Sequence, residues 1–169
     1  TTTDPWALTS WTQIGTIVGE KVACGRTRAA AIHDGGKVSH WGKINFSPTA
    51  VTEILDASDD SKTAVDLSCG DGHCCAVMKD KTIKCWGYNA NGQLGDGTNT
   101  DSRTTPVSVS GISNAVSVYA HYSITCAVLE DKTAKCWGLQ KSGEFGNDSD
   151  NDDDNSNTPV AVSGLTDVK

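Results

Sequence analysis

Seven cysteines are the residues whose types and spacing most clearly suggest chemistry in this 169-residue chain. Cys75 and Cys85 are ten residues apart, and Cys126 and Cys136 have the same separation. A hairpin centred on Asp80 places Cys75 opposite Cys85, where the Cα atoms of a non-hydrogen-bonded antiparallel pair are ~4.5 Å apart, within reach of a disulfide. The spacing therefore predicts one disulfide within each pair and an oxidising compartment.

An acidic run follows the second cysteine pair. The run NDSDNDDDNSN, residues 147–157, contains alternating carboxylates at Asp148, Asp150, Asp152 and Asp154. Calcium loops use such carboxylates, but a twelve-residue loop that began at Asp148 would lack the turning glycine and the closing glutamate. We therefore expect a solvated acidic loop, with weak calcium binding by those four carboxylates as the alternative and no other cofactor.

The remaining polar residues form no recognisable catalytic constellation. The four histidines lie in or beside expected strands, where a structural role is the favoured interpretation. The adjacent Cys74 and Cys75 point to opposite faces of a strand, which disfavours a zinc site. Two N-glycosylation sequons begin at Asn45 and Asn147 and matter only in a source that glycosylates its proteins. The sequence thus predicts a protein that is not an enzyme.

The cysteine pairs belong to an internal repeat. Three segments align without gaps: CGRTRAAAIHDGGKVSHWG, CGDGHCCAVMKDKTIKCWG and AHYSITCAVLEDKTAKCWG, which begin at residues 24, 69 and 120. Trp41, Trp86 and Trp137 mark the register, with periods of 45 and 51 residues. The second and third units continue into a matching glycine-rich stretch, in which Gly111 aligns with Gly164, and the first unit has lost this stretch. The chain therefore contains three units, the first of them degenerate.

Each unit is expected to form a small antiparallel sheet. In the second unit, residues 76–78 and 83–86 flank a polar turn, and Val107 and Val109 alternate with serines as in a strand with one buried face. No stretch longer than ~10 residues has a helical apolar period. Four short strands per unit, with one tryptophan between neighbouring sheets, are typical of propeller blades. The sequence predicts an all-β chain, a β-propeller-like repeat array of about three four-stranded blades that forms a partial propeller or open arc.

The repeat sets the expected boundaries. We place an N-terminal arm or outer strand at residues 1–21, the degenerate first blade at 22–66, the second at 67–117 and the third at 118–169. The arm contains Trp6 and Trp11, which we predict to contact another subunit by strand addition.

The repeat also suggests how the other cysteines pair. Cys24 and Cys69 occupy equivalent positions in adjacent units, so a Cys24–Cys69 bridge between neighbouring blades is the expected third disulfide. Cys74 has no cysteine counterpart, and an odd number of cysteines leaves at least one unpaired within the chain. Cys74 is the predicted unpaired thiol, either a small buried hydrophobe or half of an intermolecular bridge.

A family resemblance adds to this interpretation. The string HCCAVMKDKTIKCWGYNANGQLGDGT, followed by TTPVSVSGISNAVSV, resembles the repeat of the regulator of chromosome condensation (RCC) family, in the cysteine-containing version of exported multi-repeat proteins. The resemblance covers residues 22–169, strongly in the second and third units and weakly in the first. It implies a β-propeller, usually closed with seven blades, that serves as a protein-interaction platform.

Charge and hydropathy limit the partners. The formal net charge is −7, whereas nucleic acids and anionic membranes favour lysine and arginine clusters. We therefore expect no nucleic acid partner, and no run of ~20 apolar residues predicts a membrane span. The first ten residues lack the features of a signal peptide, as a mature chain would. With disulfides expected, we predict an extracellular location, secreted or at the cell surface.

The leading functional prediction is a non-enzymatic extracellular module for protein–protein interaction or self-assembly. Three blades leave two apolar sheet faces bare, so more chain or other subunits must cover them, and a homo-oligomer or filament is one expected outcome. Two alternatives remain open: a surface adhesin or lectin-like binder that uses the acidic calcium-type loop, and a GTPase- or chromatin-binding regulator, as in some members of the RCC family. The expected disulfides and the acidic charge disfavour the regulator.

Overall fold

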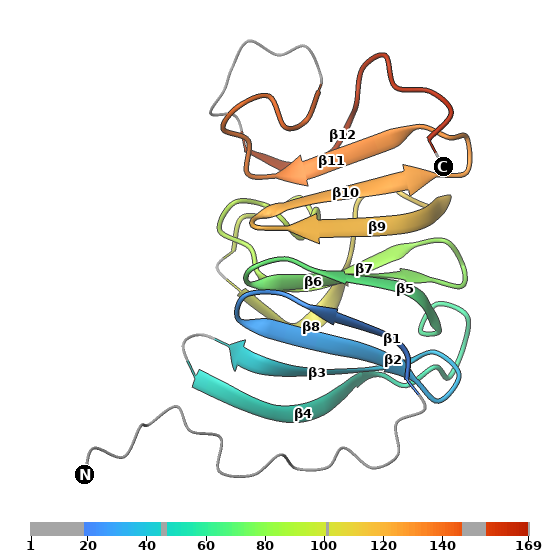
Figure 1. The fold of residues 1–169 in the computed structure, drawn as a ribbon, viewed down its shortest axis with the longest axis vertical. Coiled ribbons are helices and arrows are strands. Elements are labelled where there is room, and N and C mark those ends of the chain that lie inside the picture. Colours follow the sequence, from blue (N-terminus) through green and yellow to red (C-terminus); the bar gives the residue numbers. More distant parts are fainter. Residues whose placement is uncertain (1–18, 45–46, 101, 147–154, 169) are drawn as a thin grey trace, which may run out of the picture.

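The computed structural model describes residues 19–44, 47–100, 102–146 and 155–168, and Figure 1 shows their arrangement. These residues form strands and loops but no helix, so no described segment is an apolar helix able to cross a bilayer. The strands are β1 (Gly19–Cys24), β2 (Arg28–His33), β3 (Lys37–Ile44), β4 (Ser47–Leu55), β5 (Ala64–Cys69), β6 (His73–Met78), β7 (Ile83–Tyr88), β8 (Ser102–Ser108), β9 (Ala115–His121), β10 (Ile124–Leu129), β11 (Ala134–Gly138) and β12 (Ser156–Ala161). The all-β prediction is confirmed.

The strands form three antiparallel four-stranded sheets, which we call blades 1, 2 and 3. The strand orders are β1-β2-β3-β4, β5-β6-β7-β8 and β9-β10-β11-β12, so each blade is a simple meander. In Figure 1 the blades stack in chain order along the long axis, blue at the bottom and orange at the top. Blade 2 packs between the other two, and the stack does not close on itself. The molecule is therefore an open arc of propeller-type blades, as the repeat predicts.

Local sequence explains the hairpin in the middle of blades 2 and 3. In blade 2 the Oδ1 atom of Asp80 accepts hydrogen bonds from the backbone N–H and the hydroxyl of Thr82, at 3.0 and 2.6 Å. Asp131 and Thr133 form the same pair in blade 3, at 3.1 and 2.6 Å. Such aspartate-centred turns satisfy the backbone of a tight reversal. They fix the register of the two strands that carry the cysteine pairs.

Two hydrophobic cores lie between the blades. The core between blades 1 and 2 contains Ala30, Ile32, Val38, Leu55, Ala64, Leu67, Cys69, Cys74, Ala76, Met78 and Trp86. The core between blades 2 and 3 contains Cys75, Val77, Ile83, Cys85, Leu94, Val109, Ile112, Ala115, Val118, Ala127, Leu129 and Trp137. Trp86 and Trp137 are fully buried, whereas Trp41 of blade 1 is only partly buried. Each blade therefore depends on its neighbour for burial, as in repeat proteins.

The blades begin slightly earlier than the sequence boundaries. The first strands start at Gly19, Ala64 and Ala115, three residues before the boundaries drawn at 22, 67 and 118. The same offset at all three positions supports the internal alignment of the units.

The predicted cysteine pairs face each other across two hairpins. Cys75 lies opposite Cys85 on β6 and β7, and Cys126 lies opposite Cys136 on β10 and β11. Both pairs are disulfide-bonded, with Cα–Cα distances of 4.1 and 4.0 Å. These bridges tie together the two middle strands of blades 2 and 3.

The remaining cysteines pair differently from the prediction. Cys69 is bonded to Cys74, with Cα atoms 4.1 Å apart, so the expected Cys24–Cys69 bridge and the expected unpaired Cys74 are both wrong. The physical reason is the three-residue turn at 70–72, which brings Cys74 directly opposite Cys69 on the adjacent strand. Cys24 lies opposite Ala29 on β2 and is the exposed free thiol.

Candidate functional site

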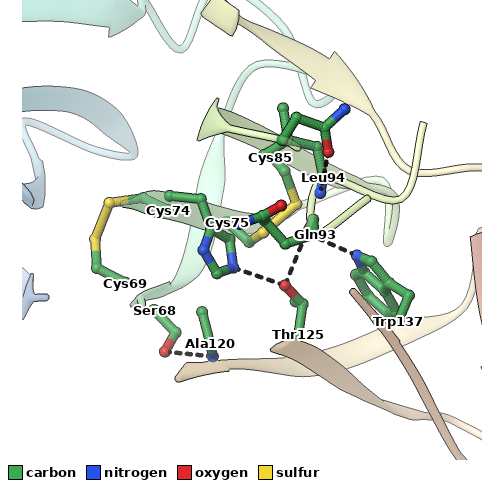
Figure 2. Close-up of a disulfide and its surroundings, with 12 residues drawn as sticks. Ser68, Cys69, Cys74, Cys75, Cys85, Gln93, Leu94, Ala120, Thr125 and Trp137 are labelled. Atoms are coloured by element: carbon green, nitrogen blue, oxygen red, sulfur yellow. Dashed lines mark hydrogen bonds between the residues drawn. A yellow bond between two sulfur atoms is a disulfide. The ribbon is translucent and has the colours of Figure 1, made fainter. Parts of the chain in front are cut away.

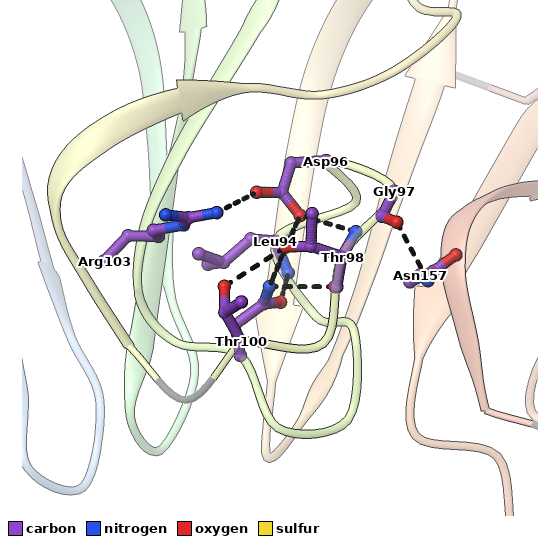
Figure 3. Close-up of polar contacts among 8 residues, drawn as sticks. Leu94, Asp96, Gly97, Thr98, Thr100, Arg103 and Asn157 are labelled. Atoms are coloured by element: carbon purple, nitrogen blue, oxygen red, sulfur yellow. Dashed lines mark hydrogen bonds and ion pairs between the residues drawn. The ribbon is translucent and has the colours of Figure 1, made fainter.

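The glycine-rich stretch of the second unit forms an ordered loop beside the junction of blades 2 and 3 (Figure 3). Within it, the Oδ1 atom of Asp96 accepts hydrogen bonds from the N–H and hydroxyl of Thr98, at 3.0 and 2.7 Å. Arg103 on β8 lies 3.7 Å from the same carboxylate. Gly97 exchanges two hydrogen bonds with Asn157 of blade 3, at 2.9 and 3.1 Å. The loop therefore links the two blades.

One carbonyl of this loop organises the polar part of the junction (Figure 2). The Gln93 carbonyl oxygen accepts hydrogen bonds from the hydroxyl of Thr125, at 2.9 Å, and from Nε1 of Trp137, at 3.0 Å. A Cβ atom on Gly95 would lie 2.7 Å from Nε1 of Trp137, so only glycine fits beside the indole. The loop both closes over the tryptophan and supplies the acceptor for its buried N–H.

His73 at the start of β6 completes this hydrogen-bond chain. Its Nε2 atom is 2.8 Å from the Thr125 hydroxyl oxygen. Because that hydroxyl donates its only hydrogen to Gln93, His73 must donate from Nε2, which assigns the neutral Nε2–H tautomer. Complete burial, and secondarily the charge of Arg28, lowers the pKa of His73 to about 3. His73 is therefore a structural histidine, as the sequence favours.

The burial of His73 predicts a pH dependence of stability. In the unfolded chain this histidine binds a proton as the pH falls through about 6.5, whereas the folded chain does not until about 3. The free energy of unfolding should therefore decrease between these two pH values, by up to about 1.4 kcal/mol per pH unit from this group. Urea titrations at several pH values should give a shallower decrease for His73→Asn. Parallel pH profiles for the two proteins would contradict the assignment.

The first strands of neighbouring blades are also joined by side chain to backbone contacts. Asp66 and Ser68 on β5 accept hydrogen bonds from the backbone N–H groups of Val118 and Ala120 on β9, at 3.0 and 2.9 Å. Lys21 on β1 forms an ion pair with Asp66. β9 is an edge strand of its sheet, so its outward N–H groups have no partner strand. The side chains of Asp66 and Ser68 accept hydrogen bonds from two of these groups in place of water.

Blade 1 presents the face that the other two blades bury. Leu67 and Val118 occupy equivalent positions on β5 and β9, and they are 1% and 2% exposed because the preceding blade covers them. Val22 occupies the same position on β1 and is 59% exposed. The difference arises from the absence of a described blade before blade 1, since the residues are chemically alike.

Blade 3 presents the complementary face at the other end. The bonds from Val109 N to Ile83 O and from Val162 N to Ala134 O have lengths of 2.9 and 3.0 Å, which establishes that the segments after β8 and β12 are equivalent. In this alignment Leu165 corresponds to Ile112. Ile112 is 5% exposed within the core between blades 2 and 3, whereas Leu165 is 42% exposed.

All three tyrosines of the chain are exposed as well. Tyr119 lies on β9, Tyr122 follows that strand, and Tyr88 ends β7. Tyr119 of blade 3 occupies the position of Ser68 in blade 2. A blade that followed blade 3 would therefore meet a tyrosine where blade 3 itself meets the Ser68 hydroxyl. Exposed tyrosines are typical of protein-binding surfaces.

Several residues singled out in the sequence lie outside the described residues. They are the arm residues Trp6 and Trp11, the sequon residues Asn45 and Asn147, and the acidic residues Asp148, Asp150, Asp152 and Asp154. Their expected roles remain predictions. Elsewhere in the described part of the chain, no three metal-ligating side chains come together.

The sequence predicts two bare apolar faces but does not identify Val22 and Leu165 as the residues that form them. A usable signal was present, because the alignment places Val22 at the position of Leu67 and Val118. Arg28, which replaces His73 in the first unit, was also overlooked as a buried charge.

The stacked meanders define the chain as an open arc of β-propeller blades. Models of the regulator of chromosome condensation (RCC1) repeat match residues 64–93 and 85–128, which run from β5 into β10. Residues 64–128 therefore consist of RCC1-type repeats, and the resemblance inferred from the sequence is confirmed.

Similar proteins show how much of a whole relative the chain represents. It is 30% identical to the ultraviolet-B receptor UVR8 of Arabidopsis thaliana over 80% of this chain and 33% of the receptor. It is 27% identical to the probable E3 ubiquitin-protein ligase HERC6 of Homo sapiens, over 89% of this chain and 16% of that protein. The structure of Prp20p from Saccharomyces cerevisiae aligns with a TM-score of 0.73 at 16% identity, over 86% of this chain and 38% of Prp20p. The chain thus spans less than two fifths of each of these proteins.

Proposed function

We propose that this protein is a non-enzymatic interaction module that binds by blade stacking, and that its partner is a further blade of the same repeat type. In a solution of this chain alone, a second copy supplies that blade. The observation that carries the proposal is the 59% exposure of Val22 at a position that is buried in both other blades. An apolar residue in this position is suited to a neighbouring sheet and not to water.

The two end faces are complementary, because they repeat the two sides of an existing junction. Leu165 on blade 3 corresponds to Ile112, which packs in the core between blades 2 and 3, and Val22 corresponds to Val118 in that same core. A blade 3 face against a blade 1 face would therefore place aliphatic residues together. The contact is head to tail, so it either closes into a ring or continues as a filament.

Charges at the two ends also match. Across the existing junction, Lys81 of blade 2 bonds to Glu130 of blade 3 at 2.6 Å. The equivalent residues at the open ends are Lys132 on blade 3 and Asp34 on blade 1. Lys132 now pairs with the exposed Asp167 at 3.2 Å, an interaction that it can exchange for Asp34 at little cost.

The three disulfides support an extracellular setting for this module. Disulfides persist in oxidising compartments and are rare where glutathione keeps thiols reduced. A net charge of −7 likewise favours a protein partner over nucleic acid. Prp20p has binding properties toward Gsp1p and histones, but for this chain the stacking faces supply the stronger argument.

Sedimentation velocity tests the proposal directly. We expect the mass-average sedimentation coefficient of the oxidised chain to rise with concentration in the micromolar to millimolar range. Val22→Asp and Leu165→Asp each place a charge on one apolar face and should weaken the association at least about tenfold. Val65→Asp is the matched control, because Val65 is 56% exposed on β5 of the middle blade and belongs to neither end face.

A wild-type chain that remains monomeric up to about 1 mM contradicts self-association. Equal weakening by Val65→Asp would show that general surface hydrophobicity, and not blade stacking, drives the association.

A further inference from the structure

The junction between blades 1 and 2 resembles the junction between blades 2 and 3, but it lacks the long loop that contains Gln93. In blade 2, β7 and β8 are joined by residues 89–101, which include Gln93. In blade 1, β3 and β4 are joined by residues 45–46 alone. Trp86 is the counterpart of Trp137 and is fully buried, yet no described residue accepts a hydrogen bond from its Nε1 atom. Among the described residues of this junction, none supplies the acceptor that Gln93 provides to Trp137.

A buried arginine lies in the same junction. Arg28 occupies in blade 1 the position that His73 occupies in blade 2, and it is only 5% exposed. Its Nε and Nη1 atoms are buried, and neither has a hydrogen-bond partner among the described residues. Unlike Arg26 and Arg103, it has no carboxylate partner among the described residues. Burial lowers the pKa of Arg28, because the guanidinium charge loses its contact with water.

Arg28 of blade 1 reaches across the junction to β7, the strand that carries Trp86. A Cβ atom on Gly87, the residue after Trp86, would lie 3.2 Å from Cζ of Arg28. The guanidinium therefore packs against the strand that carries the indole. His40 of blade 1 meets the edge of the Trp86 ring at a centroid distance of 6.3 Å. Burial, together with the charge of Arg28, lowers the pKa of His40, so this histidine is not a second cation near neutral pH.

These unpaired groups define the chemistry of a ligand. Guanidinium and indole N–H groups donate only, and each buried donor without an acceptor costs free energy. A planar carboxylate accepts two parallel hydrogen bonds from one guanidinium and keeps further lone pairs for another donor. We propose that the junction of blades 1 and 2 is a carboxylate-binding site, in which Arg28 holds both oxygens and Trp86 Nε1 donates to one of them.

The carboxylate could belong to a small free acid or to the C-terminus of a peptide, and the experiment includes both. Acetate represents the free acid, and N-acetylglycine represents a peptide terminus. N-acetylglycinamide is the uncharged match to the latter, and sodium chloride at the same ionic strength controls for general anion effects.

The indole N–H resonances in a ¹H–¹⁵N correlation spectrum of the oxidised chain provide the readout. We expect the Trp86 indole resonance, assigned by its loss in Trp86→Phe, to move in a saturable way with a Kd on the order of 1 mM. The Trp137 indole already donates to Gln93, so it is the internal control and should move little. A preference for N-acetylglycine over acetate would identify a peptide terminus as the better ligand, and the reverse would favour a free acid.

Arg28→Met tests the role of the guanidinium. It removes an unpaired buried charge while keeping an unbranched apolar side chain, so we expect the variant to fold, with the Trp137 resonance unchanged. Its affinity for the carboxylate should fall at least about tenfold. If this variant does not fold, the comparison of Trp86 with Trp137 in the wild-type chain decides the question alone.

Four results would overturn the proposal. They are no saturable shift of the Trp86 resonance up to about 50 mM carboxylate, an equal shift with the amide or with chloride, an equal shift of Trp137, and wild-type affinity in a folded Arg28→Met variant.

Discussion

Replacing Cys75 and Cys85 together by alanine should lower the free energy of unfolding by about 4 kcal/mol. The bridge closes a loop with a sequence separation of 10, and releasing such a loop accounts for about 3 kcal/mol. The rest comes from packing, because both cysteines are fully buried in the core between blades 2 and 3. Urea titration of the oxidised proteins measures the difference, which is a large fraction of the stability of an ordinary domain.

The Cys126–Cys136 bridge provides the matched control. Its sequence separation is also 10, so the entropic contribution is the same, but it lies in blade 3 outside both described cores. The double alanine variant at these positions should therefore lose only about 3 kcal/mol. Equal losses of stability for the two bridges would refute the packing contribution. Losses below about 1 kcal/mol would refute the stabilisation by loop closure.

Gly95→Ala is the second substitution with a large expected effect, about 3 kcal/mol of lost stability. Gly95 has a φ of +67°, and an added Cβ atom would meet three atoms of the Trp137 ring at 2.7, 2.9 and 3.0 Å. Trp137 is fully buried and cannot move aside. The new methyl group should therefore push the loop that carries Gly95 away from the indole, break the hydrogen bond between Trp137 and the Gln93 carbonyl, and open the junction of blades 2 and 3.

Gly111→Ala separates the backbone strain from the collision. Gly111 has nearly the same φ, +66°, but an added Cβ atom would have no neighbour within 4 Å. It should cost about 1 kcal/mol, since only the left-handed backbone is penalised. Urea titrations should thus show a difference of about 2 kcal/mol between the two variants. Similar losses would mean that the contact with Trp137 is unimportant.

The repeat made most of the fold predictable from the sequence. Aligned Trp-Gly pairs fixed the units, and the aspartate-centred turns fixed the register that sets Cys75 opposite Cys85. The first unit has Ala30 and His40 at those positions, so both cysteines are absent together, as a bridged pair requires. Each of these inferences concerns contacts within one hairpin, which local spacing determines.

Contacts that depend on a short turn or on a neighbouring blade were less predictable. The Cys69–Cys74 bridge was missed because positions were compared between units and not across the turn at 70–72, although the Gly-Asp-Gly sequence is a recognisable turn signal. The missing acceptor of Trp86 could not be read from the sequence around that residue, because the corresponding acceptor of Trp137 comes from the loop that contains Gln93. An acceptor such as the Gln93 carbonyl, which is 32 residues from Thr125 and 44 residues from Trp137, leaves no local pattern at the donor.

The two junctions show how one loop changes the chemistry of a repeat. Where the loop is present, Gln93 satisfies Thr125 and Trp137, and His73 remains neutral. In the other junction, no described residue accepts a hydrogen bond from Nε or Nη1 of Arg28 or from Nε1 of Trp86. The loop of blade 2 binds the Trp137 indole, whereas the shorter connection in blade 1 leaves the Trp86 indole N–H available to a ligand.

Mixing two blocked variants tests the head-to-tail stacking of blades most directly. Val22→Asp blocks the blade 1 face and leaves the blade 3 face intact, and Leu165→Asp does the reverse. Each variant alone should sediment as a monomer at concentrations where the wild-type chain associates. An equimolar mixture should form a complex of one chain of each kind that does not grow further, because only one productive contact remains. A mixture that stays monomeric while the wild-type chain associates would contradict blade stacking at these faces.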